Sequence, residues 1–147
     1  MRRIYQVLAY LVALGVVAQA AAIAFAWFAV ISDIDTGAVI DESFEGNAGH
    51  AMHGMVGMMI MPVVALLLLV MSFFARTKGA TKWALGVVGL VALQIALAFV
   101  AFGAPAVGAL HGLNALAIFV VAAIAGRRAN RAEPIVQREE PATLTPA

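Results

Sequence analysis

Charge divides this sequence into long stretches that contain no charged residue at all. Asp, Glu, Lys and Arg are absent between Arg3 and Asp33, between Glu45 and Arg76, and between Lys82 and Arg127. A membrane-spanning helix needs about 20 consecutive, mainly apolar residues. The first two stretches each hold one such span, and the third is long enough for two spans. A hydrophobic content of 64% agrees with this division, because soluble domains contain only about half apolar residues.

A turn interrupts the third stretch. Gly103, Ala104 and Pro105 fall near its middle, and Gly and Pro favour turns. We therefore predict an all-α fold, an integral membrane four-helix bundle formed by residues 1–131. Its helices are expected at about 4–31, 50–74, 82–102 and 106–125, with a loop at about 32–49. The Pro-containing, charged segment 132–147 is predicted to be a disordered tail.

The first stretch also resembles a cleavable signal peptide. Arg2 and Arg3, an apolar run and the small-residue motif Ala18-Gln19-Ala20 are the features of such a signal. The apolar run continues without a break to Ile31, however, which is longer than the apolar core of a signal peptide and long enough to span a bilayer. We therefore interpret it as a transmembrane helix.

The distribution of charge signs predicts an orientation. Every basic residue precedes the first helix, lies between the second and third, or follows the fourth: Arg2, Arg3, Arg76, Lys78, Lys82, Arg127, Arg128, Arg131 and Arg138. The charged residues of the loop between the first and second helices are all Asp or Glu. Because Lys and Arg are enriched in cytoplasmic loops, both termini and the tail are predicted to be cytoplasmic and the acidic loop external.

Few polar side chains fall inside the predicted spans, where they are costly and tend to mark function or helix contacts. They are Gln19, His50, His53, Gln94, His111 and Asn114. At a rise of about 1.5 Å per residue, His50 and His53 fall in the first turn of the second helix and His111 in the second turn of the fourth. Both helices begin at the external face, so all three histidines of the chain are expected at one depth, in the outer leaflet.

Two imidazoles that face each other across a four-helix bundle are what a b-type haem needs, one on each side of the iron. His50 and His53 are three residues apart and therefore share a helix face, so either can oppose His111. Gly54 and Gly57 follow His53, and Gly108 and Gly112 flank His111. Glycine allows a porphyrin or another backbone to come close.

Two other interpretations remain open. The polar residues can simply hold the helices together, in a non-catalytic membrane scaffold or accessory subunit without a cofactor. Alternatively, the three histidines can form a copper or zinc site, since thioether and imidazole together suit Cu(I) and five methionines lie near His50 and His53. Methionine is also a good gap filler in apolar cores, so most of these side chains are expected to pack. Pro62 is expected to distort the second helix.

Three segments resemble one four-helix half of the haem A synthase fold. They are His53-Gly54-Met55-Val56-Gly57 after the acidic loop, Leu93-Gln94-Ile95-Ala96-Leu97-Ala98, and Ala109-Leu110-His111-Gly112-Leu113-Asn114-Ala115-Leu116. The resemblance implies that His53 and His111 are axial ligands of a haem. The chain is also similar to small uncharacterised four-helix membrane proteins of bacteria with the same plan of histidines. It differs from haem A synthases in having Gly54 where an Arg usually follows the ligand, and in holding one half only.

From these observations we expect a small protein of the bacterial plasma (inner) membrane that binds haem b for electron transfer or haem handling. The expected site has His53 and His111 on the iron and His50 as a supporting or alternate ligand; its other members are Gly57, Gly112, Gln94 and Asn114. The lipid bilayer is the expected partner, together with a second copy in a homodimer or a larger membrane complex, and no nucleic acid. No candidate catalytic base or second cofactor motif is found, so the sequence leaves open whether the protein is an enzyme.

Overall fold

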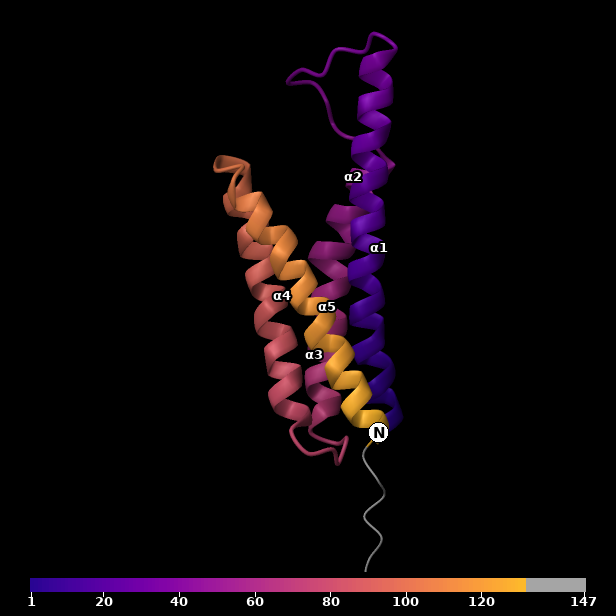
Figure 1. Ribbon diagram of the computed structural model, residues 1–147, viewed down its shortest axis with the longest axis vertical. Helices are drawn as coiled ribbons and strands as arrows, with labels where there is room; N and C mark the ends of the chain where they lie inside the picture. The colour runs from indigo at the N-terminus through magenta and orange to yellow at the C-terminus, as the bar shows by residue number, and fades with distance from the viewer. Residues whose placement is uncertain (132–147) are drawn as a thin grey trace, which may run out of the picture.

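A computed structural model describes residues 1–131 of the chain. In this part every regular element is helical, as predicted (Figure 1). The elements are α1 (Arg2–Asp35), α2 (Ala48–Met55), the π-helix η1 (Val56–Ile60), α3 (Met61–Ser72), α4 (Ala80–Gly103) and α5 (Val107–Arg131). Because α2, η1 and α3 follow one another without a break, they form one span, Ala48–Ser72. Residues 1–131 thus contain four helical segments long and apolar enough to cross a membrane. The predicted tail, 132–147, lies outside the described residues.

The helix ends depart from the predicted ones mainly in α1 and α5. Helix α1 continues to Asp35, four residues past the predicted end, because the first left-handed glycine, Gly37 with φ 101°, comes only after its Thr36 cap. With 34 residues it is about 51 Å long, well above the 30 Å of a bilayer core. Its end therefore rises above the other helices (Figure 1). Helix α5 also runs further than predicted, to Arg131.

The distortion expected at Pro62 takes the form of a π-helical turn. The N–H of Met61 bonds to the carbonyl of Val56, five residues earlier, instead of the usual four. Proline has no N–H and its ring collides with the carbonyl four residues before it, so a wider turn at this point relieves the clash. The turn lies between His53 and the packed part of the span and therefore sets the direction in which His53 points.

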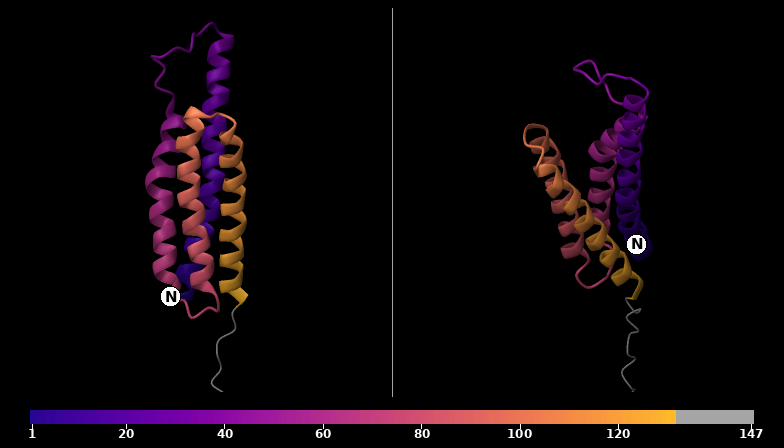
Figure 2. Two further views of the ribbon diagram at one scale, coloured as in Figure 1. Left: turned by 90° about the vertical axis from the view of Figure 1, so that its left-hand side faces the viewer. Right: turned by 45° about the horizontal axis from the view of Figure 1, so that its top comes forward.

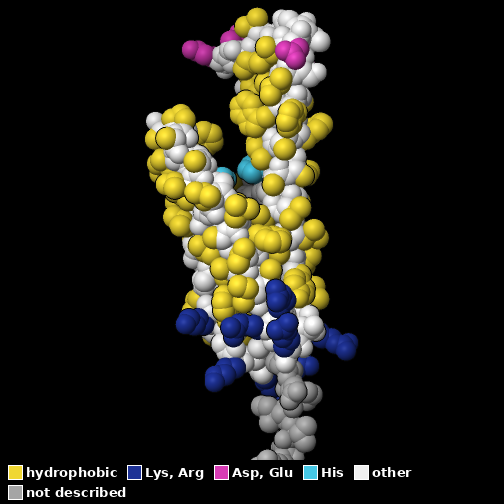
Figure 3. Space-filling view, in the orientation of Figure 1, with side chains coloured by type: hydrophobic (Ala, Val, Ile, Leu, Met, Phe, Trp, Pro, Cys, Tyr) yellow, Lys and Arg dark blue, Asp and Glu magenta, His cyan; other side chains and the backbone are white. Residues whose placement is uncertain are grey.

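Lys and Arg gather at one end of the bundle and Asp and Glu at the other (Figure 3). We call these the basic end and the acidic end. The buried core extends from the basic end to about mid-length, where small residues let the helices approach closely. It comprises Tyr5, Ala9, Val12, Ala13, Val16, Met61, Ala65, Leu68, Ala75, Ala80, Ala84, Val87, Val91, Ile118, Ala122, Ala125 and Ala129. The Tyr5 hydroxyl fastens α1 to α4 by donating a hydrogen bond to the Ala80 carbonyl, 3.1 Å away.

Towards the acidic end the bundle divides into two helical hairpins (Figures 1 and 2). The first hairpin is α1 with the span Ala48–Ser72, and the second is α4 with α5. In the first, Gly49 is so close to α1 that an added Cβ would lie 2.7 Å from the Ala22 carbonyl oxygen. Large apolar side chains such as Leu14, Phe28 and Phe102 are exposed around the molecule. Soluble proteins rarely expose so continuous an apolar surface, whereas it is typical of a multi-pass membrane protein.

Candidate functional site

A cleft opens between the two hairpins at the acidic end, and histidine side chains lie at its base (Figure 3). His53, from the first hairpin, faces His111, from the second. Their ring centroids are 6.3 Å apart and their planes are tilted by 55°. Both side chains are half-buried. The cleft therefore brings together two imidazoles that are 58 positions apart in the chain.

His53 is held by a reciprocal pair of hydrogen bonds with Gln19 of α1. Its Nδ1 lies 3.1 Å from the backbone oxygen of Gln19, and the Gln19 side-chain Nε2 donates to the backbone oxygen of His53 at 3.0 Å. A carbonyl oxygen can only accept, so Nδ1 must carry the proton of this hydrogen bond. In the neutral ring Nε2 is then left with a free lone pair.

His111 is held in the same way by the second hairpin. Its Nδ1 lies 3.0 Å from the backbone oxygen of Gln94 in α4, which again leaves the Nε2 lone pair free. Asn114, 8% exposed, supports this contact by donating to the Gln94 side-chain oxygen at 2.7 Å and to the Leu90 carbonyl at 2.9 Å. Gln94 and Asn114, predicted as members of the site, therefore lie behind His111 and fix α4 to α5.

The sequences around His53 and His111, and the hydrogen bonds that hold the two histidines, follow one pattern. Ala51-Met52-His53-Gly54-Met55 and Ala109-Leu110-His111-Gly112-Leu113 differ only in exchanges of Met and Leu. In each hairpin the histidine binds the backbone carbonyl of a glutamine on the preceding helix. Gln19 was not predicted to be a partner of His53, although the repeated motif was a signal that could have indicated equivalent roles for Gln19 and Gln94.

The glycines of the region differ in what surrounds them. At Gly57 an added Cβ would lie 2.7 Å from the Gln19 Nε2, so this glycine leaves room for the Gln19 side chain, which donates a hydrogen bond to the His53 backbone oxygen. At Gly54, Gly108 and Gly112 an added Cβ would meet nothing within 4 Å. Open space thus adjoins both histidines. The buried Oε1 of Gln19 has no hydrogen-bond partner among the described residues.

His50 has a different setting from the other two histidines. It takes part in a capping box at the start of α2, in which its Nδ1 accepts from the Asn47 N–H at 3.2 Å and Asn47 Oδ1 accepts from the Gly49 and His50 N–H groups. Its ring stands edge-on to Trp27 and Phe44, with centroids 5.1 and 6.0 Å away. Within residues 1–131, no three His, Cys, Asp or Glu side chains are grouped so that they could hold a metal ion.

No protein-family model, curated protein or solved structure matches the chain.

The hydrogen bond between the Asn114 and Gln94 side chains predicts a measurable energetic coupling between these two residues. We expect the double variant Gln94→Leu/Asn114→Leu to lose less unfolding free energy than the two single variants together, by about 0.5–1.5 kcal/mol, the range of hydrogen bonds between membrane helices. Denaturant unfolding of the four proteins in mixed micelles measures this difference. Strictly additive losses would show that the 2.7 Å contact contributes nothing to stability.

Proposed function

We propose that this chain is a small multi-pass membrane protein that binds one b-type haem between its hairpins, with His53 and His111 as axial ligands, for electron transfer or haem handling. The observation that carries the proposal is the His53–His111 pair: both rings are oriented by a backbone carbonyl at Nδ1, and both leave Nε2 free. Histidines that bind metals are usually oriented in this way, by a hydrogen bond from the other ring nitrogen.

The separation of the rings supports two imidazoles on opposite sides of one metal ion. A metal–nitrogen bond of about 2 Å, plus about 1 Å from that nitrogen to the ring centre on each side, places the two centroids about 6 Å apart. The observed separation is 6.3 Å. The two rings therefore already stand near the spacing that a shared metal would require.

The number of ligands favours haem over a bare ion. Structural zinc takes four ligands from the protein and catalytic zinc three, whereas the cleft brings together only two histidines, and no grouping of three His, Cys, Asp or Glu side chains is found in residues 1–131. A haem iron brings four nitrogen ligands of its own and needs only the two axial ones. The bound haem would supply one-electron chemistry, and the chain would hold it, set its axial ligands and limit access of water.

The residues around His53 and His111 indicate which contacts would hold the porphyrin and its propionates. Gly108 lies three residues before His111, on the same helix face, and has open space beside it. Every Lys and Arg of residues 1–131 lies at the basic end (Figure 3), so the haem propionates would be solvated by water at the acidic end. Binding would therefore depend on the two axial bonds and on burial of the porphyrin in the apolar cleft.

For the orientation we propose that the basic end faces the cytoplasm of a bacterial cell and that the cleft lies in the outer leaflet of the plasma membrane. The support is the segregation of charge, since positive charges next to spans are retained in the cytoplasm. A haem at this depth could exchange electrons with partners outside the cytoplasm or within the bilayer.

A second candidate function is a scaffold without a cofactor. It is favoured by the fact that Gln19, His53, Gln94, His111 and Asn114 all make hydrogen bonds between helices, which stabilise membrane bundles. On this account the protein is colourless, and the histidines contribute only to stability.

Absorption spectra of single variants separate the two functions. Protein produced with ample haem and purified in detergent is expected to show a reduced b-type spectrum with one haem per chain. His53→Ala and His111→Ala are each expected to lose most of the haem, because each removes one axial ligand. His50→Ala is the matched control and should keep the haem, since the contacts of His50 are those of a helix cap. Circular dichroism confirms that each variant is helical. Colourless wild-type protein, or haem retained in both His53→Ala and His111→Ala, would refute the proposal.

Filling the open space beside His111 tests where the haem lies. We expect Gly108→Leu to lower haem content severalfold, because the new side chain would occupy space next to the proposed ligand. Gly89→Leu is the control: Gly89 is also a helical glycine with nothing within 4 Å, but it lies in α4, about a turn and a half from Gln94 towards the basic end. Equal haem contents in the two variants, measured by pyridine haemochrome, would show that the porphyrin does not lie at Gly108.

A further inference from the structure

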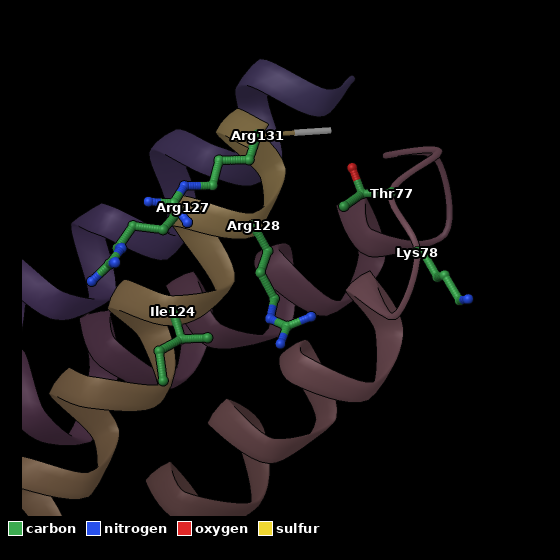
Figure 4. Close-up of a pocket in the computed structure, with 6 residues that line it drawn as sticks. All are labelled: Thr77, Lys78, Ile124, Arg127, Arg128 and Arg131. Carbon is green, nitrogen blue, oxygen red and sulfur yellow. The ribbon is translucent and has the colours of Figure 1, made fainter. Parts of the chain in front are cut away.

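The basic end contains a pocket that the proposed haem site does not involve (Figure 4). Its volume is about 660 Å³, within the range of about 300–1,000 Å³ that is usual for small-molecule sites. The pocket is lined by Thr77, Lys78, Ile124, Arg127, Arg128 and Arg131. It therefore lies between the C-terminal part of α5 and the loop that joins α3 to α4.

The electrostatic character of the pocket is one-sided. Four of its six lining residues are cationic and none is acidic. Arg128 and Arg131 lie in the last turn of α5, where positive charge is favourable because of the helix dipole. Lys78 lies in the loop and Arg127 lies before the last turn of α5, so the helix dipole does not account for them. Like charges gathered around one cavity repel one another, and an anion bound among them would relieve this repulsion.

One of the arginines is held in position. The Arg128 guanidinium lies 5.1 Å from the centre of the Trp83 ring, a cation–π contact that restrains its side chain. Figure 4 shows Arg128 between the loop that carries Thr77 and Lys78 and the side chains of Arg127 and Arg131 on α5; the Lys78 and Arg127 side chains point away from Arg128 in this structure. A planar guanidinium fixed in this way can bind two oxygens of a phosphate at once.

The location of the pocket indicates what kind of anion it takes. Ile124 lines the same cavity as the arginines, one turn closer to the apolar surface of the bundle. Because its lining combines Ile124 with four cationic residues, the pocket lies at the border between the apolar side chains and the band of Lys and Arg at the basic end. A phospholipid presents a phosphate and an apolar chain across this same border, and basic pockets between membrane helices bind such head groups.

We propose that this pocket binds the phosphate group of an anionic phospholipid, with Arg128 at the centre of the site and Lys78, Arg127 and Arg131 around it. Inorganic phosphate carries the same phosphate group as a phospholipid and could in principle bind the same cations. Ile124 and the position at the border of the apolar band favour the lipid as its source. This inference rests on residues of the basic end and is independent of the haem proposal.

Trp83 provides a direct readout of binding. In a Trp27→Phe background Trp83 is the only tryptophan of the chain. An anion that binds Arg128 alters the cation–π contact of Arg128 with Trp83 and is therefore expected to change the fluorescence of Trp83. Protein in a non-ionic detergent is titrated with dihexanoyl phosphatidylglycerol, with dihexanoyl phosphatidylcholine and with inorganic phosphate. In detergent there are no leaflets, so the direction of membrane insertion does not affect the result.

Two triple variants of equal net charge distinguish binding of the lipid in this pocket from general attraction of the lipid to the basic end. Lys78→Gln/Arg127→Gln/Arg131→Gln removes lining cations and leaves the Arg128–Trp83 reporter intact. Arg3→Gln/Arg76→Gln/Lys82→Gln removes as many charges from the same end of the molecule without touching the lining. Circular dichroism and thermal unfolding establish that both variants are folded.

We expect saturable binding of phosphatidylglycerol that is weakened about tenfold or more in the lining variant, a loss of about 1.4 kcal/mol or more, and less than twofold in the control. Phosphatidylcholine and inorganic phosphate should bind at least tenfold more weakly than phosphatidylglycerol. Equal weakening in both variants would overturn the pocket, because it would show attraction to the whole basic end. Phosphate binding as tight as that of the lipid would overturn the lipid assignment, as would the absence of any response to phosphatidylglycerol.

Discussion

The arrangement of this protein depends on the need of polar groups within an apolar bundle to find partners inside the protein. His53 and His111 meet this need in the same way, each by a hydrogen bond from Nδ1 to the backbone carbonyl of a glutamine on the preceding helix. The bond joins the two helices of its hairpin, and it also fixes the ring and its tautomer. The hydrogen bond that joins the helices of each hairpin therefore also leaves the lone pair of Nε2 free in the neutral ring. In this sense structure and proposed function rest on one interaction.

The site lies where close packing of the four helices ends. Towards the basic end, alanines such as Ala84 and Ala122 are fully buried and allow the helices to approach one another. Beyond mid-length the hairpins diverge, and the space between them contains the two histidines (Figure 3). The π-helix η1 begins three residues after His53, and its wider turn changes the rotation of α2 relative to α3. Such turns often occur at functional sites, and here the turn sets how His53 faces the second hairpin.

Much of the fold could be predicted from the sequence, because uncharged stretches of the right length specify spans directly. The end of α1 could not, since Asp33 marks where the uncharged stretch ends, whereas the helix continues to Asp35. The spacing of His50 and His53 placed both on one helix face and could not decide between them; the capping box with Asn47, which depends on the conformation of the loop, separates their roles. Gly57 was predicted as a member of the haem site; its closeness to the Gln19 side chain depends on the packing of α1 and could not be predicted from the sequence. Hydrogen bonds to backbone carbonyls, such as that of Gln19, depend on no particular residue type and leave little trace in a sequence.

If both imidazoles bind one iron, electron paramagnetic resonance of the ferric, haem-loaded protein will detect it, because two axial imidazoles enforce a low-spin iron. We expect a low-spin signal in the wild-type and His50→Ala proteins, and conversion of whatever haem remains in His111→Ala to a high-spin signal. A wild-type protein that binds haem in a high-spin state, or a low-spin signal that survives replacement of either His53 or His111, would contradict the binding of one iron by both imidazoles.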